Sequence, residues 1–446
     1  MSLRPRFSTL FALALVLVAA LLVATAVLLD VSARPPGGKT VVTVRLWDEQ
    51  VASAYRQSFA AFSRAHPDIE VQTHVVSYST YFNTLRTDVA GGSADDIFWI
   101  SSAYLAGYAD SGRLMDIGKT LGVGTAKAWE PSVVEQFTRG GALWAVPQLT
   151  DGGIALYYNA DLLAVAGVNP ADLAALRWSP NGGDTLRPLL ARLTVDADGH
   201  TAATPGFDAG RIRRWAYNAA NDAQGIYLNY IGSAGGVFQD GDRFAFDNPG
   251  AIEAFTYLVR LINNDHVAPP ASDTNDNGDF SRNQFLAGRM ALFQSGTYNL
   301  AAVAAQAGFH WGVALLPAGP KGRVTVTNGI AAAGNSASSH PDAVRQVLAW
   351  MGSNDGNQYI GRHGSAIPAV RSAQKVYFDY WAAKQVDVKP FFAVLNGPRI
   401  DAPGGAGFAA GNQVIKPYFD EMFLGRSDVP TTLHQAQEAA NAAARR

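Results

Sequence analysis

Residues 283–320 constrain the fold of this 446-residue chain more than any other segment; their sequence is NQFLAGRMALFQSGTYNLAAVAAQAGFHWGVALLPAGP. The segment opens as an amphipathic helix, breaks at Gly288, and continues as a short apolar strand over Met290–Phe293. A polar turn at residues 295–298 leads into a second helix, and His310–Leu316 is a second strand. Helix, strand, helix and strand in this order are typical of an α/β sheet.

The turn at residues 295–298, Ser-Gly-Thr-Tyr, is a candidate ligand-binding edge. A strand that feeds a glycine-containing turn at a helix N-terminus presents free backbone N–H groups to a ligand, so Gly296 is a candidate contact. Tyr298 would stand at the mouth of the site as an aromatic platform. Ligands of open α/β sheets bind at such strand ends.

The same segment resembles the GKxAM…GxW…WGVxxLPxGP signature of the family 1 extracellular solute-binding proteins, the carbohydrate-binding receptors of ABC importers. Further blocks agree in order and spacing, among them VTVRLWDEQ and TDVAGGSADDIFWISS within residues 41–115. The segments at residues 141–170 and 419–441 agree as well. Together the blocks cover most of residues 40–441, and their joint order is a stronger signal than any one motif.

The resemblance implies an α/β fold of two doubly wound lobes joined by a hinge, similar to the type II periplasmic binding proteins and discontinuous in sequence. The residues themselves show a β-α-β-α-β pattern up to Ile100, which predicts a doubly wound lobe. A bend after Thr150 marks the first crossing between lobes, and a strand over Val324–Ala333 the second. We expect the first lobe to contain residues 41–150 and 327–375, and the second lobe residues 151–326 and 376–446.

The first 33 residues predict export. Arg4 and Arg6 precede an apolar, uncharged run over residues 7–29, and a positive flank before such a block is typical of an export signal. The run is also long enough to span a bilayer, so residues 1–33 are either a cleaved signal peptide or a retained anchor. Residues 34–40 read as a linker. The basic flank places the folded part outside the cytoplasmic membrane, in the periplasm or on the outer face of the cytoplasmic membrane.

Composition narrows the classes of function. The formal charge is −2, which gives no electrostatic basis for nucleic-acid binding. The absence of cysteine excludes disulfides, thiolate metal sites and the lipidated cysteine of many relatives. Residues 273–278 copy half of a calcium loop, but its twelfth position is Gln284 rather than a bidentate glutamate. We expect a monomer without metal or cofactor.

Polar and aromatic residues at the predicted strand ends are the candidate ligand contacts. Trp47 and Asp48 follow the first strand, where an indole face suits a sugar ring and a carboxylate suits its hydroxyl groups. In the alternative interpretation Trp47 is a core residue and Asp48 and Ser101 cap helices. Asp151 lies at the first crossing, where an Asx-turn is its alternative role. Together with the positions that the resemblance implies, the expected contacts are Trp47, Asp48, Tyr78, Ser101, Tyr104, Asp151, Tyr158, Tyr227, Gly296, Tyr298, Asn328 and Gly329.

These features favour a non-catalytic receptor that closes about its hinge on a mono- or oligosaccharide, and the resemblance implies delivery to the membrane permease of an ABC importer. Three candidate carboxylates, Asp48, Glu49 and Asp151, leave room for an amine-bearing sugar. Two alternatives stay open. One is a glycoside hydrolase, which needs two carboxyl groups ~5–10 Å apart. The other is a receptor for a non-sugar solute such as a polyamine or peptide.

Overall fold

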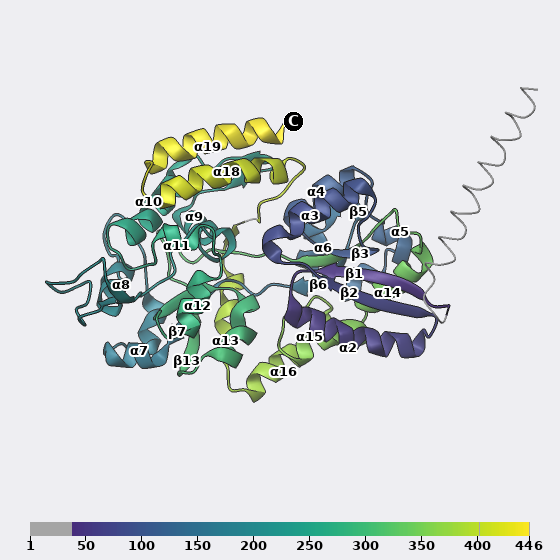
Figure 1. The fold of residues 1–446 in the computed structure, drawn as a ribbon, viewed down its shortest axis with the longest axis horizontal. Helices are drawn as coiled ribbons and strands as arrows, with labels where there is room; N and C mark the ends of the chain where they lie inside the picture. The colour runs from purple at the N-terminus through teal and green to yellow at the C-terminus, as the bar shows by residue number, and fades with distance from the viewer. Residues whose placement is uncertain (1–37, 401, 446) are drawn as a thin grey trace, which may run out of the picture.

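The computed structural model describes residues 38–400 and 402–445, so the predicted export segment lies outside the described residues. These residues form two α/β lobes side by side (Figure 1), and the predicted two-lobed α/β architecture is confirmed. In the described part of the chain no helix combines the length and the apolar character needed to cross a bilayer.

The first lobe is built on one six-stranded sheet. Strand β3 is buried along its whole length, as a strand covered by helices on both faces must be. Strands β1, β2 and β3 run parallel, whereas β15 pairs antiparallel with both β3 and β6. In order across the sheet the strands are β16 (Ile367–Pro368), β6 (Val146–Thr150), β15 (Ile330–Gly334), β3 (Ile97–Ser101), β1 (Thr40–Leu46) and β2 (Ile69–Val75).

Helices cover both faces of this sheet, with α3 and α4 above it and α2 and α15 below it in Figure 1. The parallel strands alternate with helices, so the carboxyl ends of β1 and β3 meet at one edge, and that edge faces the second lobe. The helices of this lobe are α2 (Glu49–Ala65), α3 (Tyr78–Gly91), α4 (Ser102–Asp110), α5 (Ile117–Leu121), α6 (Pro131–Gln136), α14 (Pro341–Met351) and α15 (Asn354–Arg362).

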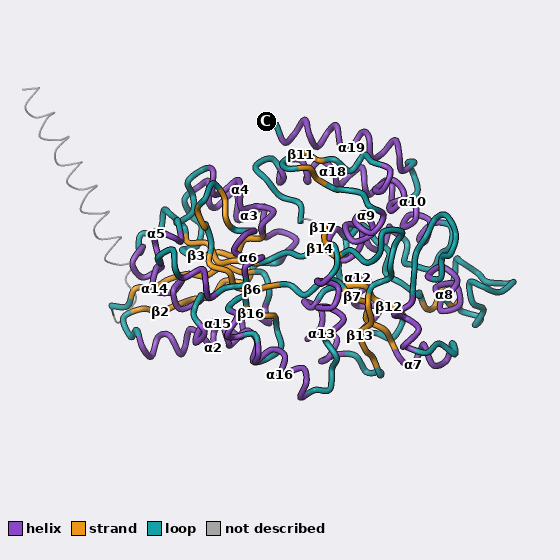
Figure 2. The backbone as a smooth tube through the Cα atoms, turned by 180° about the vertical axis from the view of Figure 1, so that it is seen from behind, coloured by secondary structure: helices purple, strands orange, loops and turns teal. Residues whose placement is uncertain are grey.

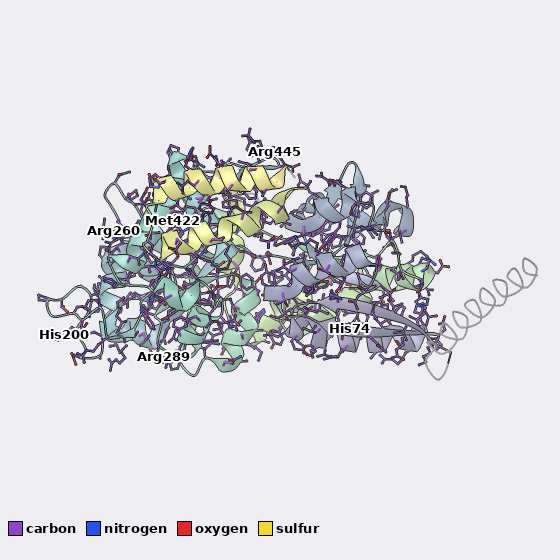
Figure 3. The ribbon with its side chains drawn as sticks, turned by 45° about the horizontal axis from the view of Figure 1, so that its top comes forward. His74, His200, Arg260, Arg289, Met422 and Arg445 are labelled. Carbon is purple, nitrogen blue, oxygen red and sulfur yellow. The ribbon has the colours of Figure 1, made fainter. Side chains whose placement is uncertain are left out.

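The second lobe has a smaller sheet in which β7 (Ala155–Asn159) lies between β12 (Leu292–Ser295) and β13 (Trp311–Leu315) and pairs antiparallel with both. Met422 is fully buried within α18, and Figure 3 labels it in the lobe opposite to His74. The helices here are α7 (Ala160–Val165), α8 (Leu186–Leu193), α9 (Leu228–Ala234), α10 (Pro249–Asn263), α11 (Ala271–Thr274), α12 (Phe280–Leu286), α13 (Leu300–Gln306), α18 (Phe408–Phe423) and α19 (Val429–Ala444).

The strand predicted over residues 324–333 is two strands in different lobes. Strand β14 (Thr325–Val326) pairs with β17 (Arg399–Ile400), whereas β15 belongs to the first sheet. The break has a physical reason, because the backbone N–H groups between them bond to distant side chains. Asn328 N donates to Asp151 Oδ2 at 3.2 Å, and Gly329 N donates to Gln136 Oε1 at 2.6 Å.

The chain passes between the lobes at the ends of β6 and β14, which face the junction in the view from behind (Figure 2). Gly153 lies on the first crossing, where its N–H donates to Phe391 O at 2.6 Å. A Cβ there would clash with Val394, so this close approach requires glycine. Strand β16 lies in the first sheet, and the helices α16 (Lys375–Ala383) and α17 (Lys389–Ala393) follow it. We keep the lobe boundaries after residues 150, 326 and 375 as our proposal.

A buried hydrogen-bond chain ties β6 to the rest of the first lobe. Trp99 Nε1 donates to the Tyr55 hydroxyl at 3.1 Å, and that hydroxyl donates to Gln148 Oε1 at 2.8 Å. All three side chains are almost completely buried. Because buried polar groups are costly to leave unpaired, this chain holds helix α2 and strands β3 and β6 in one arrangement.

Tyr55→Phe tests that chain. Removing the hydroxyl leaves the Trp99 indole N–H without its acceptor and leaves Gln148 Oε1 with only the long bond from Asn357 Nδ2, so we expect the free energy of unfolding to fall by about 1–3 kcal/mol. Urea unfolding followed by tryptophan fluorescence measures the change. The control is Tyr359→Phe, because the Tyr359 hydroxyl bonds to no described residue. Equal stability of the Tyr55 variant and the wild type would contradict the assigned role.

Candidate functional site

Trp47 begins an aromatic cluster at the carboxyl end of β1. Its ring lies edge-on to Tyr81 at 4.8 Å, to Trp99 at 5.0 Å and to Tyr78 at 5.8 Å between centroids. Tyr81 and Trp99 belong to the core, whereas Tyr78 keeps 62% of its surface exposed. The half-buried Trp47 therefore joins the core of the first lobe to an exposed tyrosine at the interlobe edge.

Asp48 caps helix α2 in the structure. One carboxylate oxygen accepts from Gln50 N at 2.8 Å and from Val51 N at 3.0 Å. Burial raises the pKa of this carboxyl, and the two backbone donors oppose the rise. The neighbouring Glu49 pairs with Arg56 on the exposed side of the helix, and 67% of the Glu49 side chain is exposed. The capping role considered for Asp48 is thus present, and Glu49 makes its contact away from the cleft.

Asp151 connects both crossings to the second lobe. Its Oδ2 accepts from Gln224 Nε2 at 3.0 Å and from Asn328 N at 3.2 Å. Burial raises the pKa of Asp151 to about 7, against the opposing effect of these two donors. A carboxyl with this pKa changes its charge near neutral pH, which is characteristic of functional sites more often than of structural ion pairs.

Asp222 is a second acid of this site, and the sequence analysis did not find it. It caps a single π-helical turn, η3 (Ala223–Tyr227), by accepting from Gly225 N at 2.9 Å. The Asp222 side chain is exposed at the surface of the lobe, and desolvation by the surrounding protein raises the pKa of its carboxyl. Isolated π turns occur frequently at functional sites.

Electrostatic interactions relate four groups from the two lobes. Tyr78 comes from α3 of the first lobe and Tyr298 from the turn after β12 of the second. Burial raises the pKa of Tyr78 to about 12 and that of Tyr298 above its usual range, and the charges of Asp151 and Asp222 raise both further. Asp151 and Asp222 therefore act electrostatically on one tyrosine of each lobe. We call these four residues the acidic cluster.

A hydrogen bond from the core of the second lobe fixes the turn that carries Tyr298. Tyr157, in β7, is fully buried and its hydroxyl donates to Gly296 O at 2.8 Å. A Cβ on Gly296 would clash with the Tyr298 ring, so the ring lies directly over this glycine. Tyr298 itself is 40% exposed, which leaves its free side open to the cleft. Tyr157, the buried member of the Tyr157–Tyr158 pair in β7, thus supports the turn on which the Tyr298 ring stands.

Several predicted contacts lie elsewhere. Tyr227 is buried and packs against Phe238 and Phe255 in the core of the second lobe. Tyr158 lies against Gly312, and the charge that raises its pKa after burial is that of Asp387, not of the acidic cluster. Besides burial, the charge of Asp222 also raises the pKa of Tyr227, but the Tyr227 side chain is buried, and both tyrosines stay predictions as ligand contacts. Nothing in the residue pattern around Tyr227 distinguished a core tyrosine from one in the cleft.

Serine, glutamine and asparagine residues near the second crossing are joined by hydrogen bonds. Ser101 is 6% exposed, and the hydroxyl that reaches the crossing is that of Ser102, which donates to Asn328 Oδ1 at 3.0 Å. Gly329 N is engaged by Gln136. Gln224, which the sequence analysis also missed, places its amide on Asp151. The polar run Asn-Asp-Ala-Gln at residues 221–224 could have indicated Gln224 as a site residue.

Two cavities lie between the lobes. One, of about 890 Å³, lies between α3 and α4 on one side and the start of α18 on the other, and Tyr78 and Tyr104 line it. The second, of about 530 Å³, lies between α4 and residues 232–242. Tyr104 stacks on Phe82 at 3.9 Å in the first cavity and meets Phe408 of α18 edge-on at 5.8 Å. The described residues contain no group of three or more acidic or histidine side chains able to hold a metal ion.

The sequence and the fold of this chain are similar to those of known binding proteins. The family described as bacterial extracellular solute-binding protein matches residues 47–358. Mycobacterium tuberculosis UspC, a crystal structure, is 77% identical, with a TM-score of 0.73 over 91% of this chain and all of that one. An ABC substrate-binding protein of Listeria monocytogenes in complex with cycloalternan shares the fold at 19% identity, with a TM-score of 0.77 over 91% of this chain and 98% of that one.

A Deinococcus radiodurans protein described as an ABC transporter-binding protein is 30% identical over 247 residues. The match covers 54% of each chain, so this chain spans about half the length of that relative. The Brucella binding proteins, at 22% identity, match over 93% of this chain and 95% of their own length.

The pKa of Asp151 predicts how stability depends on pH. The folded value, about 7, lies above the ordinary value of 3.8, so the folded protein holds a proton that the unfolded chain releases between these limits. The free energy of unfolding therefore falls as pH rises through this window. Asp151→Asn keeps an oxygen acceptor for Gln224 and Asn328 and should make the decline shallower.

Urea unfolding at about pH 5 and pH 7.5 measures that difference in slope. Asp68→Asn, at an exposed aspartate of the first lobe, is the matched control and should follow the wild type. If the Asp151 and Asp68 variants gave the same pH dependence, the assignment of a raised pKa to Asp151 would be wrong.

Proposed function

The chain belongs to the bacterial extracellular solute-binding proteins, and from that membership we propose that it captures a carbohydrate between its lobes and delivers it to the permease of an ABC importer. The observation that carries this proposal is the acidic cluster, in which the same two carboxyl groups act electrostatically on an exposed tyrosine from each lobe. Residues 1–33 would export the chain, as a signal peptide or an anchor, and it would act as a monomer.

The chemistry of the cluster suits a polyhydroxylated ligand. The faces of Tyr78 and Tyr298 offer apolar area for sugar rings, and the Asp151 and Asp222 oxygens accept from hydroxyl groups. Solved proteins of this fold support the ligand class, since the GacH receptor of Streptomyces glaucescens was solved with acarbose and a Bdellovibrio bacteriovorus maltodextrin-binding domain with maltotriose. A ligand that touches both lobes favours their closed arrangement, so binding would shift the hinge toward closure.

The charges of the cluster favour an amine-bearing sugar. The charged groups that affect both Tyr78 and Tyr298 are the carboxylates of Asp151 and Asp222, with no basic group among them. An ammonium group would compensate carboxylates that are otherwise poorly hydrated. The set of acids differs from the one the sequence suggested, because Glu49 pairs with Arg56 and Asp222 lies at the cluster instead.

One observation favours the rival function, a glycoside hydrolase. A carboxyl with a pKa of about 7 suits a general acid, and a second carboxyl, Asp222, acts on the same tyrosines. The family consists of binding proteins, and capture needs no bond to be broken. Incubation of the pure protein with nitrophenyl glycosides and oligosaccharides separates the two functions, and we expect no release of nitrophenol or sugar. Turnover that Asp151→Asn abolishes would establish the hydrolase instead.

Tyr298→Ala tests the aromatic platform. We expect isothermal titration calorimetry against glucose, glucosamine, N-acetylglucosamine and maltose to detect at least one ligand of the wild type. The variant should bind that ligand about tenfold more weakly, because a stacked ring is lost. Tyr359→Ala removes a half-buried tyrosine on α15 and is the control. Absence of binding to every carbohydrate tested would sink the receptor proposal, whereas unchanged affinity in the variant would remove Tyr298 from the site.

Asp222→Asn tests the preference for an amine. We expect the wild type to bind glucosamine more tightly than glucose, and the variant to lose about tenfold of this preference because one compensating charge is gone. Glu49→Gln is the matched control, since it removes the acid that the sequence suggested but that pairs with Arg56. The ratio of the two dissociation constants is the measurement. A ratio that stays the same in the Asp222 variant would contradict the role of this acid.

A further inference from the structure

The 890 Å³ cavity has a charge opposite to that of the acidic cluster. Three basic side chains line it and no acidic one does. Arg86 comes from α3, Arg113 from the loop after α4, and Lys416 from α18 of the second lobe. We call this cavity the basic groove. Its volume lies within the usual range of small-molecule sites, ~300–1,000 Å³.

Two of the three cations are uncompensated. Arg86 and Arg113 are exposed and form no ion pair with any residue of the described ranges, 38–400 and 402–445. Lys416, in contrast, pairs with Asp276 at 3.1 Å and with Asp420. Arg45 and Arg139 of the first lobe also have carboxylate partners. The groove thus holds two free guanidinium groups on its first-lobe wall.

Arg86 lies close to the aromatic lining of the groove. Burial raises the pKa values of Tyr104 and Tyr108, and the positive charge of Arg86 opposes both increases. Tyr104 lines the groove with its ring stacked on Phe82. The guanidinium therefore stands beside an apolar ring surface, as in sites where arginine binds an anionic group on a stacked ligand.

The basic groove and the acidic cluster share one aromatic wall. Tyr78 belongs to the cluster and also lines the groove. From Tyr78 the ring of Phe82 is 5.7 Å away, Tyr104 follows at 3.9 Å from Phe82, and Phe408 closes the series at 5.8 Å from Tyr104. A ligand that lies against Tyr78, Phe82 and Tyr104, which line the groove, can present one end to the carboxylates and the other to the arginines.

We propose that the basic groove binds an anionic substituent, a carboxylate or a phosphate, on the saccharide whose amine or hydroxyl groups lie at the acidic cluster. The ligand class of this receptor is then a sugar that carries both signs of charge. This inference rests on the proposed carbohydrate-receptor function and adds the chemistry of the second end of its ligand. Arg86 and Arg113 donate to the anion, and the aromatic wall positions the ring that carries it.

Paired sugars test the proposal. The affinity of the wild-type protein is measured by isothermal titration calorimetry for glucosamine, glucosamine 6-phosphate and glucosaminuronic acid. We expect the phosphate, the carboxylate or both to raise the affinity about tenfold over glucosamine, and the gain to shrink in 0.5 M NaCl. Comparison of the two anionic sugars shows which substituent the groove accepts.

Arg86→Ala should abolish the gain while leaving the affinity for glucosamine within about twofold of the wild type. Arg64→Ala is the matched control, because Arg64 is also an exposed arginine on a first-lobe helix, forms no ion pair with a described residue, and lies outside the groove. This variant should keep the full gain. Both positions are exposed, so both variants should unfold at the temperature of the wild type.

Equal affinity of the wild type for glucosamine and both anionic sugars would overturn the proposal, and so would an equal loss in the Arg64 and Arg86 variants. In either case glucosamine binding would persist and the receptor function would stand. If none of the three sugars, nor any neutral sugar, bound to the wild type, the receptor function itself would fail together with this inference.

Discussion

The Asp151 carboxylate makes the contact on which the geometry of the cleft depends. One of its oxygens accepts from a side chain of the second lobe, Gln224, and from the backbone of the second crossing at Asn328, while the residue itself belongs to the first crossing. Three segments far apart in the chain are thus tied at one oxygen. Because this oxygen is held in a poorly hydrated position, the carboxyl is poised between its charged and neutral forms near neutral pH.

The sequence predicted those parts of the fold and site that repeat a local pattern. Alternation and helical spacing located the strands and helices of the first lobe, and the turn chemistry located Tyr298. Strand β14 ends at Val326 because the next N–H groups bond to side chains over a hundred residues away in the chain, which no local pattern reveals. Asp222 caps a π turn, which has no periodic sequence pattern. The residues around Tyr227 likewise do not indicate whether its side chain lies in the core or in the cleft.

Local sequence patterns also could not show which acidic residues contribute to the cleft. Glu49 follows directly after the first strand, and proximity in sequence suggested a place beside Asp48. In the structure Arg56 lies on the same exposed side of helix α2 and pairs with Glu49, so that charge is used locally. The acid that acts on the same tyrosines as Asp151 is Asp222, which comes from the second lobe. Sequence reasoning finds residues that share a strand end, but a cleft between two lobes is assembled from both.

An interlobe cleft with carboxylates at one end and unpaired arginines at the other disfavours any ligand that leaves these charged side chains without a partner of opposite charge. In the open protein water solvates the exposed side chains of Asp222, Arg86 and Arg113, whereas Asp151 is already poorly hydrated. When the lobes approach, each charge loses water, and that loss is costly unless the ligand supplies the opposite charge. A neutral sugar could stack on the aromatic wall but would leave both ends uncompensated. Specificity in such a site comes as much from this penalty against poorly matched solutes as from contacts with the right one.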